Sequence, residues 1–227
     1  MKIRYFLVAF LGMAFLSLLG VASWQSVHAA DREGIEKLNT PEEIQKFRNE
    51  FIKNFHRTGL NTTPGDARLL RILVASANCK RGIEVGSASG FGAINMGMAF
   101  ERNGGKLYTI DIDPQMVATT REHIKEMGLE KSVEAVEGDA LKVLPALEGE
   151  FDFIFIDALK QDYLKYFKAV EAKMKPGSVI VADNVIVSAE AMKDFLTYME
   201  ESPDYDMQII RCSDEKGDGM AVIYKLK

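Results

Sequence analysis

Short apolar runs alternate with amphipathic segments along most of the chain. The apolar runs predict strands over residues 81–86, 106–112, 132–137 and 151–157, and a fifth that opens at Gly177 and ends at Asp183. The segments between them predict helices that begin near Phe91, Pro114 and Tyr163, the last extending to Met174, with a short helix after residue 137. Five strand–helix repeats predict an α/β fold with a parallel, doubly wound sheet.

Further elements flank these repeats. Thr40 is the predicted N-cap of an early helix, with Pro41 at its first position and Glu43 closing a capping box. A second helix follows "NTTPGD". After the fifth strand, a helix from about Glu190 leads to "DMQIIRC" and "GMAVIYKL". These last two runs are too close for a crossover, so they predict a closing hairpin-like pair.

The first thirty residues have the composition of a targeting segment. Lys2 and Arg4 precede an uncharged apolar run over residues 5–24, and Val27 and Ala29 form a small-residue cleavage pair. We expect residues 1–29 to be a signal peptide and residues 30–227 one domain, periplasmic or extracellular after cleavage. The alternative is a permanent membrane anchor through residues 5–24, which also leaves the domain outside.

Charge and composition exclude several classes of site. Without residues 1–29 the chain has 26 basic and 33 acidic residues, a net charge of −7, which argues against a nucleic-acid partner. Only His56 and His123 remain, so a zinc site of histidines and cysteines is not expected. Cys79 and Cys212 are too few for a disulfide framework, and whether they pair stays open.

A glycine-rich turn follows the first predicted strand. In "IEVGSASGFG", Gly86 and Gly90 allow the backbone to approach a ligand closely at a helix N-terminus. The spacing fits neither the dinucleotide pattern nor a phosphate loop. At the end of the second strand, Asp111 is placed to accept hydrogen bonds from a ribose diol, whereas Asp113, before Pro114, caps the next helix. The sequence therefore predicts an adenosine-type ligand.

Polar residues also end the fourth and fifth strands. Asp157 follows one apolar run, and Asp183 and Asn184 follow the next. Ligands of such sheets collect where the strands end, so these three side chains are expected at one edge. Two carboxylates and an amide oxygen form a hard ligand set, suited to Mg²⁺ or Ca²⁺ and poor for zinc.

Together these motifs resemble a known family. The pattern E-x-G-x-x-x-G with a strand-terminal acid resembles class I S-adenosylmethionine-dependent methyltransferases, and "FIDALKQDYLKYF" with "ADNVIV" resembles the catechol and caffeoyl-CoA O-methyltransferases. The likeness runs from about Leu60 to Leu226. It implies a Rossmann-like fold with helices on both faces of seven strands, the last strand antiparallel.

The resemblance also implies a reaction and a set of residues. Methyl transfer from S-adenosyl-L-methionine to a hydroxyl of a small vicinal diphenol is implied, with Mg²⁺, or another hard cation such as Ca²⁺ or Mn²⁺, taking both substrate oxygens. By position, Lys160 and Asp157 correspond to catalytic residues, and Asp157, Asp183 and Asn184 to metal ligands. The positions that correspond to cofactor contacts are Thr62, Glu84, Gly86, Ser87, Gly92, Asp111, Ala140 and Asp157. Asp139 is left with two roles, an adenine contact or a helix cap.

The chain departs from the family at several points. Catechol enzymes have an aromatic residue before the lysine and a proline after "DNVIV", where this chain has Leu159 and Ser188. The longer insert of the plant caffeoyl-CoA type after the fifth strand is absent. A second acid near the C-terminus has three candidates, Asp214, Glu215 and Asp218, and Asp218 is more simply a turn.

Two hypotheses follow from these patterns. The first is a Mg²⁺-dependent O-methyltransferase, and the second is an exported S-adenosyl-ligand-binding protein without turnover, since the cofactor is made in the cytosol. Retention of buried charges in the catalytic positions favours the enzyme, because unpaired buried charges are costly. The oligomeric state stays open, a homodimer included.

Overall fold

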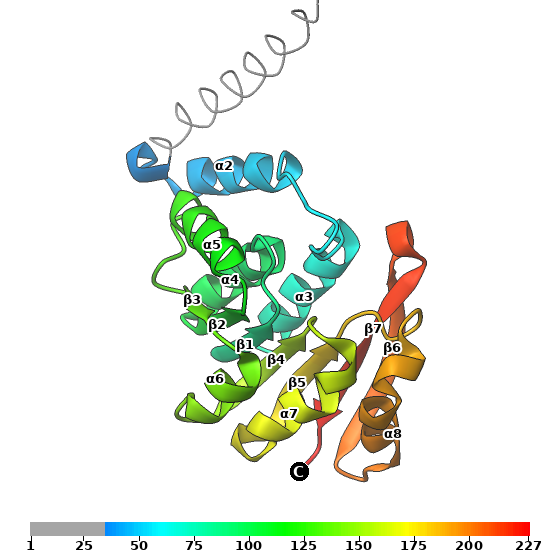
Figure 1. Cartoon of the computed structure of the whole chain (residues 1–227). Coiled ribbons are helices and arrows are strands. Elements are labelled where there is room, and N and C mark those ends of the chain that lie inside the picture. Colours follow the sequence, from blue (N-terminus) through cyan, green and yellow to red (C-terminus); the bar gives the residue numbers. More distant parts are fainter. Residues whose placement is uncertain (1–34) are drawn as a thin grey trace, which may run out of the picture. The chain divides into compact units, whose positions relative to one another are not determined.

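The structure, a computed structural model, describes residues 35–227 (Figure 1). The predicted signal or anchor in residues 1–29 lies outside the described residues. The chain divides into two units, Met1–Asn49 and Glu50–Lys227. In the described part of the first unit, η1 (Ile35–Lys37) precedes α2 (Pro41–Lys53), which continues into the second unit. The capping box is confirmed: Glu43 donates its backbone N–H to Thr40 Oγ1 (3.2 Å), and Thr40 donates its own to Glu43 Oε2 (3.1 Å).

A seven-stranded sheet forms the centre of the second unit. Its order is β3-β2-β1-β4-β5-β7-β6; the first five strands of the chain are parallel, and β7 is antiparallel to both β5 and β6. The predicted fold, with its antiparallel last strand, is thus confirmed. The strands are β1 (Arg81–Val85), β2 (Lys106–Asp111), β3 (Val133–Glu137), β4 (Phe151–Ile156), β5 (Met174–Ala182), β6 (Tyr205–Ser213) and β7 (Asp218–Lys225).

Helices cover both faces of this sheet. They are α3 (Pro64–Ser76), α4 (Phe91–Asn103), α5 (Pro114–Glu126), α6 (Ala140–Ala146), α7 (Tyr163–Val170) and α8 (Lys193–Glu201), with short 3₁₀ turns η2 (Lys160–Asp162), η3 (Glu171–Lys173), η4 (Ala189–Met192) and η5 (Asp214–Lys216). Within residues 35–227, no helix is both long enough and apolar enough to cross a membrane.

Two neighbouring predicted boundaries are wrong, the end of the helix that begins near Tyr163 and the start of the fifth strand, which was expected at Gly177. The helix expected to reach Met174 ends at Val170, and Met174 is instead the first residue of β5, opposite Phe151 of β4. Met174 fits a helical apolar stripe as well as a strand, so the pattern did not distinguish the two. Pro176 does, since a proline disfavours helical geometry in the residue before it.

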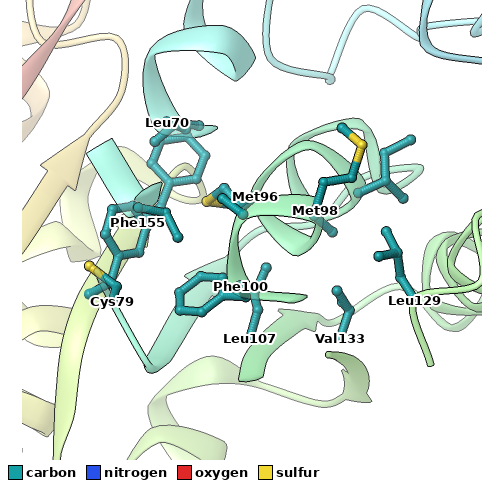
Figure 2. Close-up of a cluster of buried hydrophobic side chains, with 14 of the residues drawn as sticks. Leu70, Cys79, Met96, Met98, Phe100, Leu107, Leu129, Val133 and Phe155 are labelled. Atoms are coloured by element: carbon teal, nitrogen blue, oxygen red, sulfur yellow. The ribbon is translucent and has the colours of Figure 1, made fainter. Parts of the chain in front are cut away.

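The strands bury alternate side chains in two separate cores. Phe153 and Phe155 of β4 pack with α3, α4 and α5, in the cluster shown in Figure 2. Ile154 and Ile156 of the same strand pack on the other face, with α6, α7 and α8. Because both faces are covered at the centre of the sheet, β1, β4 and β5 are accessible mainly at their ends. Cys79 and Cys212 are both free, so the structure does not pair them.

Candidate active site

The carboxyl ends of β1 and β4 approach closely at one edge of the sheet. Gly86 has a φ of 95°, and a Cβ at this position would lie 2.1 Å from the carbonyl oxygen of Asp157. A larger residue would push the two ends apart. The glycine therefore brings the predicted nucleoside loop against the first predicted metal ligand.

Asp111, at the end of β2, fixes the glycine-rich loop. Its Oδ2 accepts the backbone N–H groups of Ser87 (3.0 Å) and Ala88 (2.9 Å), and its Oδ1 accepts that of Asp113 (3.0 Å). Asp113 in turn caps α5 by accepting the N–H of Gln115 at 2.8 Å, as predicted. A carboxylate has about four acceptor positions. The three N–H groups occupy three of them, and the Ser87 hydroxyl lies 3.4 Å from Oδ2, so a ribose hydroxyl would take the remaining position or replace Ser87.

Glu84 is a buried acid beside this loop. It is 1% exposed, and Thr109 donates its hydroxyl to Oε2. A Cβ at Gly92 would lie 2.4 Å from Oε1 of Glu84 and 3.6 Å from Oγ1 of Thr62, so the absent side chain leaves room for both groups. Burial raises the pKa of Glu84 to about 8, a rise that the Thr109 hydrogen bond opposes.

Asp183 is the most enclosed acid of the metal set. Its residue is 0% exposed; Oδ1 accepts the backbone N–H of Asn184 (2.8 Å), and Oδ2 is buried without a partner among the described residues. Burial raises its pKa to about 8, and the charge of Asp157 adds to the rise. A buried carboxylate oxygen without a donor is costly unless a cation or proton meets it.

Asn184 is held in an unusual conformation. Its φ is 60°, and its Nδ2 donates to Asp218 Oδ2 at 3.3 Å, which places the amide oxygen on the opposite side. Asp218 Oδ1 also accepts the N–H groups of Ile186 (3.0 Å) and Val187 (3.1 Å). The expectation that Asp218 is simply a turn residue is therefore wrong, since it begins β7 and supports the loop after β5. The flanking glycines in the sequence gave no sign of this contact.

Lys160 pairs with Asp157, the first of the two predicted metal-binding acids. Its Nζ donates to Asp157 Oδ1 (2.8 Å) and to the hydroxyl of Tyr163 (2.9 Å), which itself donates to the carbonyl of Asp183 (3.3 Å). Tyr163 is fully buried, and burial raises its pKa well above the usual value. From the sequence, Tyr163 is predicted only as a helix start, and its spacing of three residues from Lys160 is the one signal of its contact with that lysine.

The structure brings the other predicted residues to the same edge. Ala140 begins α6, where Gly138 donates its N–H to the carbonyl of Asp111 at 2.9 Å. Asp139 caps this helix through the N–H of Leu141 (2.9 Å), which shows one of its two proposed roles. Among residues 35–227, no three His, Cys, Asp or Glu side chains form a metal cluster; the predicted set has two carboxylates and an amide.

Exposed aliphatic side chains lie next to these polar groups. Leu159 precedes Lys160 and is 52% exposed, and Val187, in the loop after Asn184, is 69% exposed. Leu60, just before Asn61, is 74% exposed. These three residues, here called the aliphatic rim, occupy loops that carry predicted site residues.

Comparisons with known proteins give a consistent result. The sequence profile of the family described as O-methyltransferase matches residues 36–216. A catechol O-methyltransferase of Niastella koreensis is 34% identical over 139 residues, which cover 60% of this chain and 62% of the relative. A caffeoyl-CoA O-methyltransferase of Populus trichocarpa is 28% identical over 208 residues, which cover 82% of this chain and 83% of the relative. The crystal structure of TomG from Streptomyces achromogenes, an O-methyltransferase in complex with SAM, has the same fold, with a TM-score of 0.70 and 24% sequence identity. The match covers 88% of this chain and 96% of TomG.

Proposed function

Because the chain belongs to the O-methyltransferase family, we propose that it transfers a methyl group from S-adenosyl-L-methionine to a hydroxyl of a small vicinal diphenol, with Mg²⁺ or another hard divalent cation. The observation that carries this proposal is Oδ2 of Asp183, which is buried without a partner among residues 35–227 and is close enough to Asp157 for the charges to interact. Relatives named for catechol and caffeoyl-CoA support the phenolic substrate.

The donor set fits a hard cation. Asp157 and Asp183 supply carboxylate oxygens at the ends of the adjacent strands β4 and β5, and Asn184 supplies an amide oxygen that Asp218 orients. A divalent cation held there would favour the ionised form of a bound hydroxyl and orient the diol.

Lys160 is the proposed proton acceptor for the substrate hydroxyl. Its Nζ is positioned by Asp157 and Tyr163, so it is held beside the proposed metal ligands. Tyr163 is in turn fixed through the Asp183 carbonyl, which makes it a positioning residue. The transfer needs no covalent enzyme intermediate, since the sulfonium already activates the methyl group; the protein aligns oxygen, carbon and sulfur.

The nucleoside half of the site supports the cofactor assignment. Asp111 is proposed to accept a ribose hydroxyl while it holds the loop at Ser87, and Glu84 to contact the amino-acid part. Gly86, Gly92, Thr62 and Ala140 are proposed to line the same site. TomG was solved in complex with SAM, which supports this choice of cofactor.

The proposal is tested by incubating the purified full-length chain with labelled S-adenosylmethionine, Mg²⁺ and a panel of catechols. Methyl transfer to one ring hydroxyl is expected. Tight cofactor binding without transfer to any catechol would favour the alternative, an S-adenosyl-ligand-binding protein. Family membership favours the enzyme over this alternative.

Export of the domain is a further part of the proposal. It rests on residues 1–29, with residues 30–227 as the methyltransferase domain. Cell fractionation with N-terminal sequencing tests it: a mature chain beginning at residue 30 outside the cytosol is expected, whereas an uncleaved membrane-bound chain would favour the anchor.

A further inference from the structure

Asn61 carries a buried amide whose orientation the structure fixes. Its residue is 2% exposed, and its Oδ1 accepts the backbone N–H of Thr58 (2.8 Å) and the hydroxyl of Ser89 (2.8 Å). A backbone N–H can only donate, so the atom facing Thr58 must be the oxygen. The other end of the amide is therefore the NH₂ group.

In the part of the chain that the structure describes, this NH₂ group has no acceptor. Asn61 Nδ2 is buried without a partner, and so is Oγ1 of the next residue, Thr62, among the residues described. A buried donor without an acceptor loses its hydration without compensation. Two adjacent orphaned groups point to an absent ligand with acceptor oxygens rather than to a tightly closed core.

The neighbouring groups define the kind of ligand. Ser89, which contacts Asn61, belongs to the glycine-rich loop, and Thr62 Oγ1 faces Gly92 together with Glu84 Oε1. The site thus offers donors on one side and an acid on the other. The amino-acid part of S-adenosylmethionine has a matching pair, a carboxylate and an ammonium group.

We propose that Asn61 is a cofactor-binding residue whose Nδ2 donates to the α-carboxylate of the cofactor, beside the hydroxyl of Thr62. Glu84 faces the ammonium end. This inference rests on the cofactor half of the proposed function and is independent of the metal. With this contact, Asn61 would make the site bind ligands that retain the amino-acid carboxylate more tightly than ligands that contain the nucleoside alone.

The backbone around Asn61 is restrained from outside. Lys216 Nζ donates to the Asn61 carbonyl (3.3 Å), and Arg57 Nη1 donates to that of Thr62 (3.3 Å) while the Arg57 guanidinium pairs with Glu215 (2.9 Å). The amide is therefore presented in a set position before the ligand arrives, which reduces the entropy lost on binding.

Asn61→Asp tests the role of the NH₂ group. Aspartate keeps an oxygen for Thr58 and Ser89 but replaces the donor with a second oxygen, which repels a carboxylate. We expect the dissociation constant for S-adenosylhomocysteine to rise at least tenfold, measured by calorimetric titration of the full-length chain in EDTA. The dissociation constant for 5′-methylthioadenosine, which lacks the amino-acid part, is expected to change less than twofold. Asn54→Asp places the same charge at a nearby exposed position and should affect neither ligand.

Three outcomes would contradict the inference. Unchanged S-adenosylhomocysteine affinity in Asn61→Asp would show that Nδ2 does not meet the carboxylate. Equal losses of affinity for both ligands would show that Asn61 does not act on the amino-acid part of the cofactor. A wild-type chain that binds neither ligand would overturn the cofactor proposal itself, whereas loss of metal dependence alone would leave the Asn61 assignment intact.

Discussion

Glu84→Gln should change how stability depends on pH. The buried Glu84 carboxyl has a pKa raised to about 8, against 4.5 for an exposed glutamate, because burial disfavours its charged form. Between these two values the folded chain holds a proton that the unfolded chain has released. The contribution of Glu84 to stability is therefore full below pH 4.5 and is lost as the pH rises toward 8.

The size of the effect follows from this window. One proton bound only in the folded state gives a slope of about −1.4 kcal/mol per pH unit in the free energy of unfolding. Over about 3.5 pH units, from 4.5 to 8, Glu84 alone gives at most about 5 kcal/mol. The glutamine of the variant does not titrate, yet its side-chain oxygen can still accept from Thr109. Asp183 has a pKa raised in the same direction, so the wild-type slope contains both groups and the variant keeps the Asp183 part.

Urea denaturation from about pH 5 to about pH 8, in EDTA and without cofactor, measures this difference. The wild-type curve should fall more steeply than the Glu84→Gln curve, by up to about 1.4 kcal/mol per pH unit. Glu137→Gln removes an exposed acid at the end of β3 and should leave the slope unchanged. Parallel curves for wild type and Glu84→Gln would refute the assignment of a buried, protonated Glu84.

Three further predictions concern the reaction. EDTA should abolish methyl transfer and added Mg²⁺ should restore it, and full activity in EDTA would refute the metal assignment. Asp183→Ala should remove activity, while calorimetric titration should find the cofactor affinity largely unchanged. Lys160→Ala should lower kcat by roughly 10²–10⁴ with cofactor affinity nearly unchanged, and the defect should shrink as the pH rises and substrate hydroxyls ionise unaided. Asp111→Ala should weaken cofactor binding by about 1–3 kcal/mol in the same titration, because both the ribose contact and the support of Ser87 and Ala88 are lost. If Lys160→Ala instead lost cofactor affinity while Asp111→Ala lost only turnover, the placement of both residues would be wrong.

Local rules predicted the fold well. The apolar runs predicted the five parallel strands because parallel strands covered on both faces have few polar positions, and the short spacing of the last two runs predicted the antiparallel pair. The caps at Thr40 and Asp113 were predicted because each side chain acts within its own helix turn. The family resemblance inferred from the glycine loop and "ADNVIV" is confirmed by the family match.

Contacts between distant segments could not be predicted in this way. Asp218 supports Asn184, 34 residues earlier, and Ser213 donates to Asp66 across 147 residues at 2.6 Å. Neither spacing follows a helical or strand period. The orphaned amide of Asn61 was also missed, since its meaning depends on which of its partners are present in three dimensions.

The position of β7 sets the order in which the site can be completed during synthesis. This strand lies between β5 and β6, so the sheet stays open at β5 until residues 218–225 have left the ribosome. Asp218, the first residue of β7, then accepts a hydrogen bond from the loop after β5, and Lys216, two residues earlier, donates one to the Asn61 carbonyl. A nascent chain that ends before residue 214 thus lacks the supports of both halves of the pocket, although it already contains every residue proposed to contact cofactor or metal.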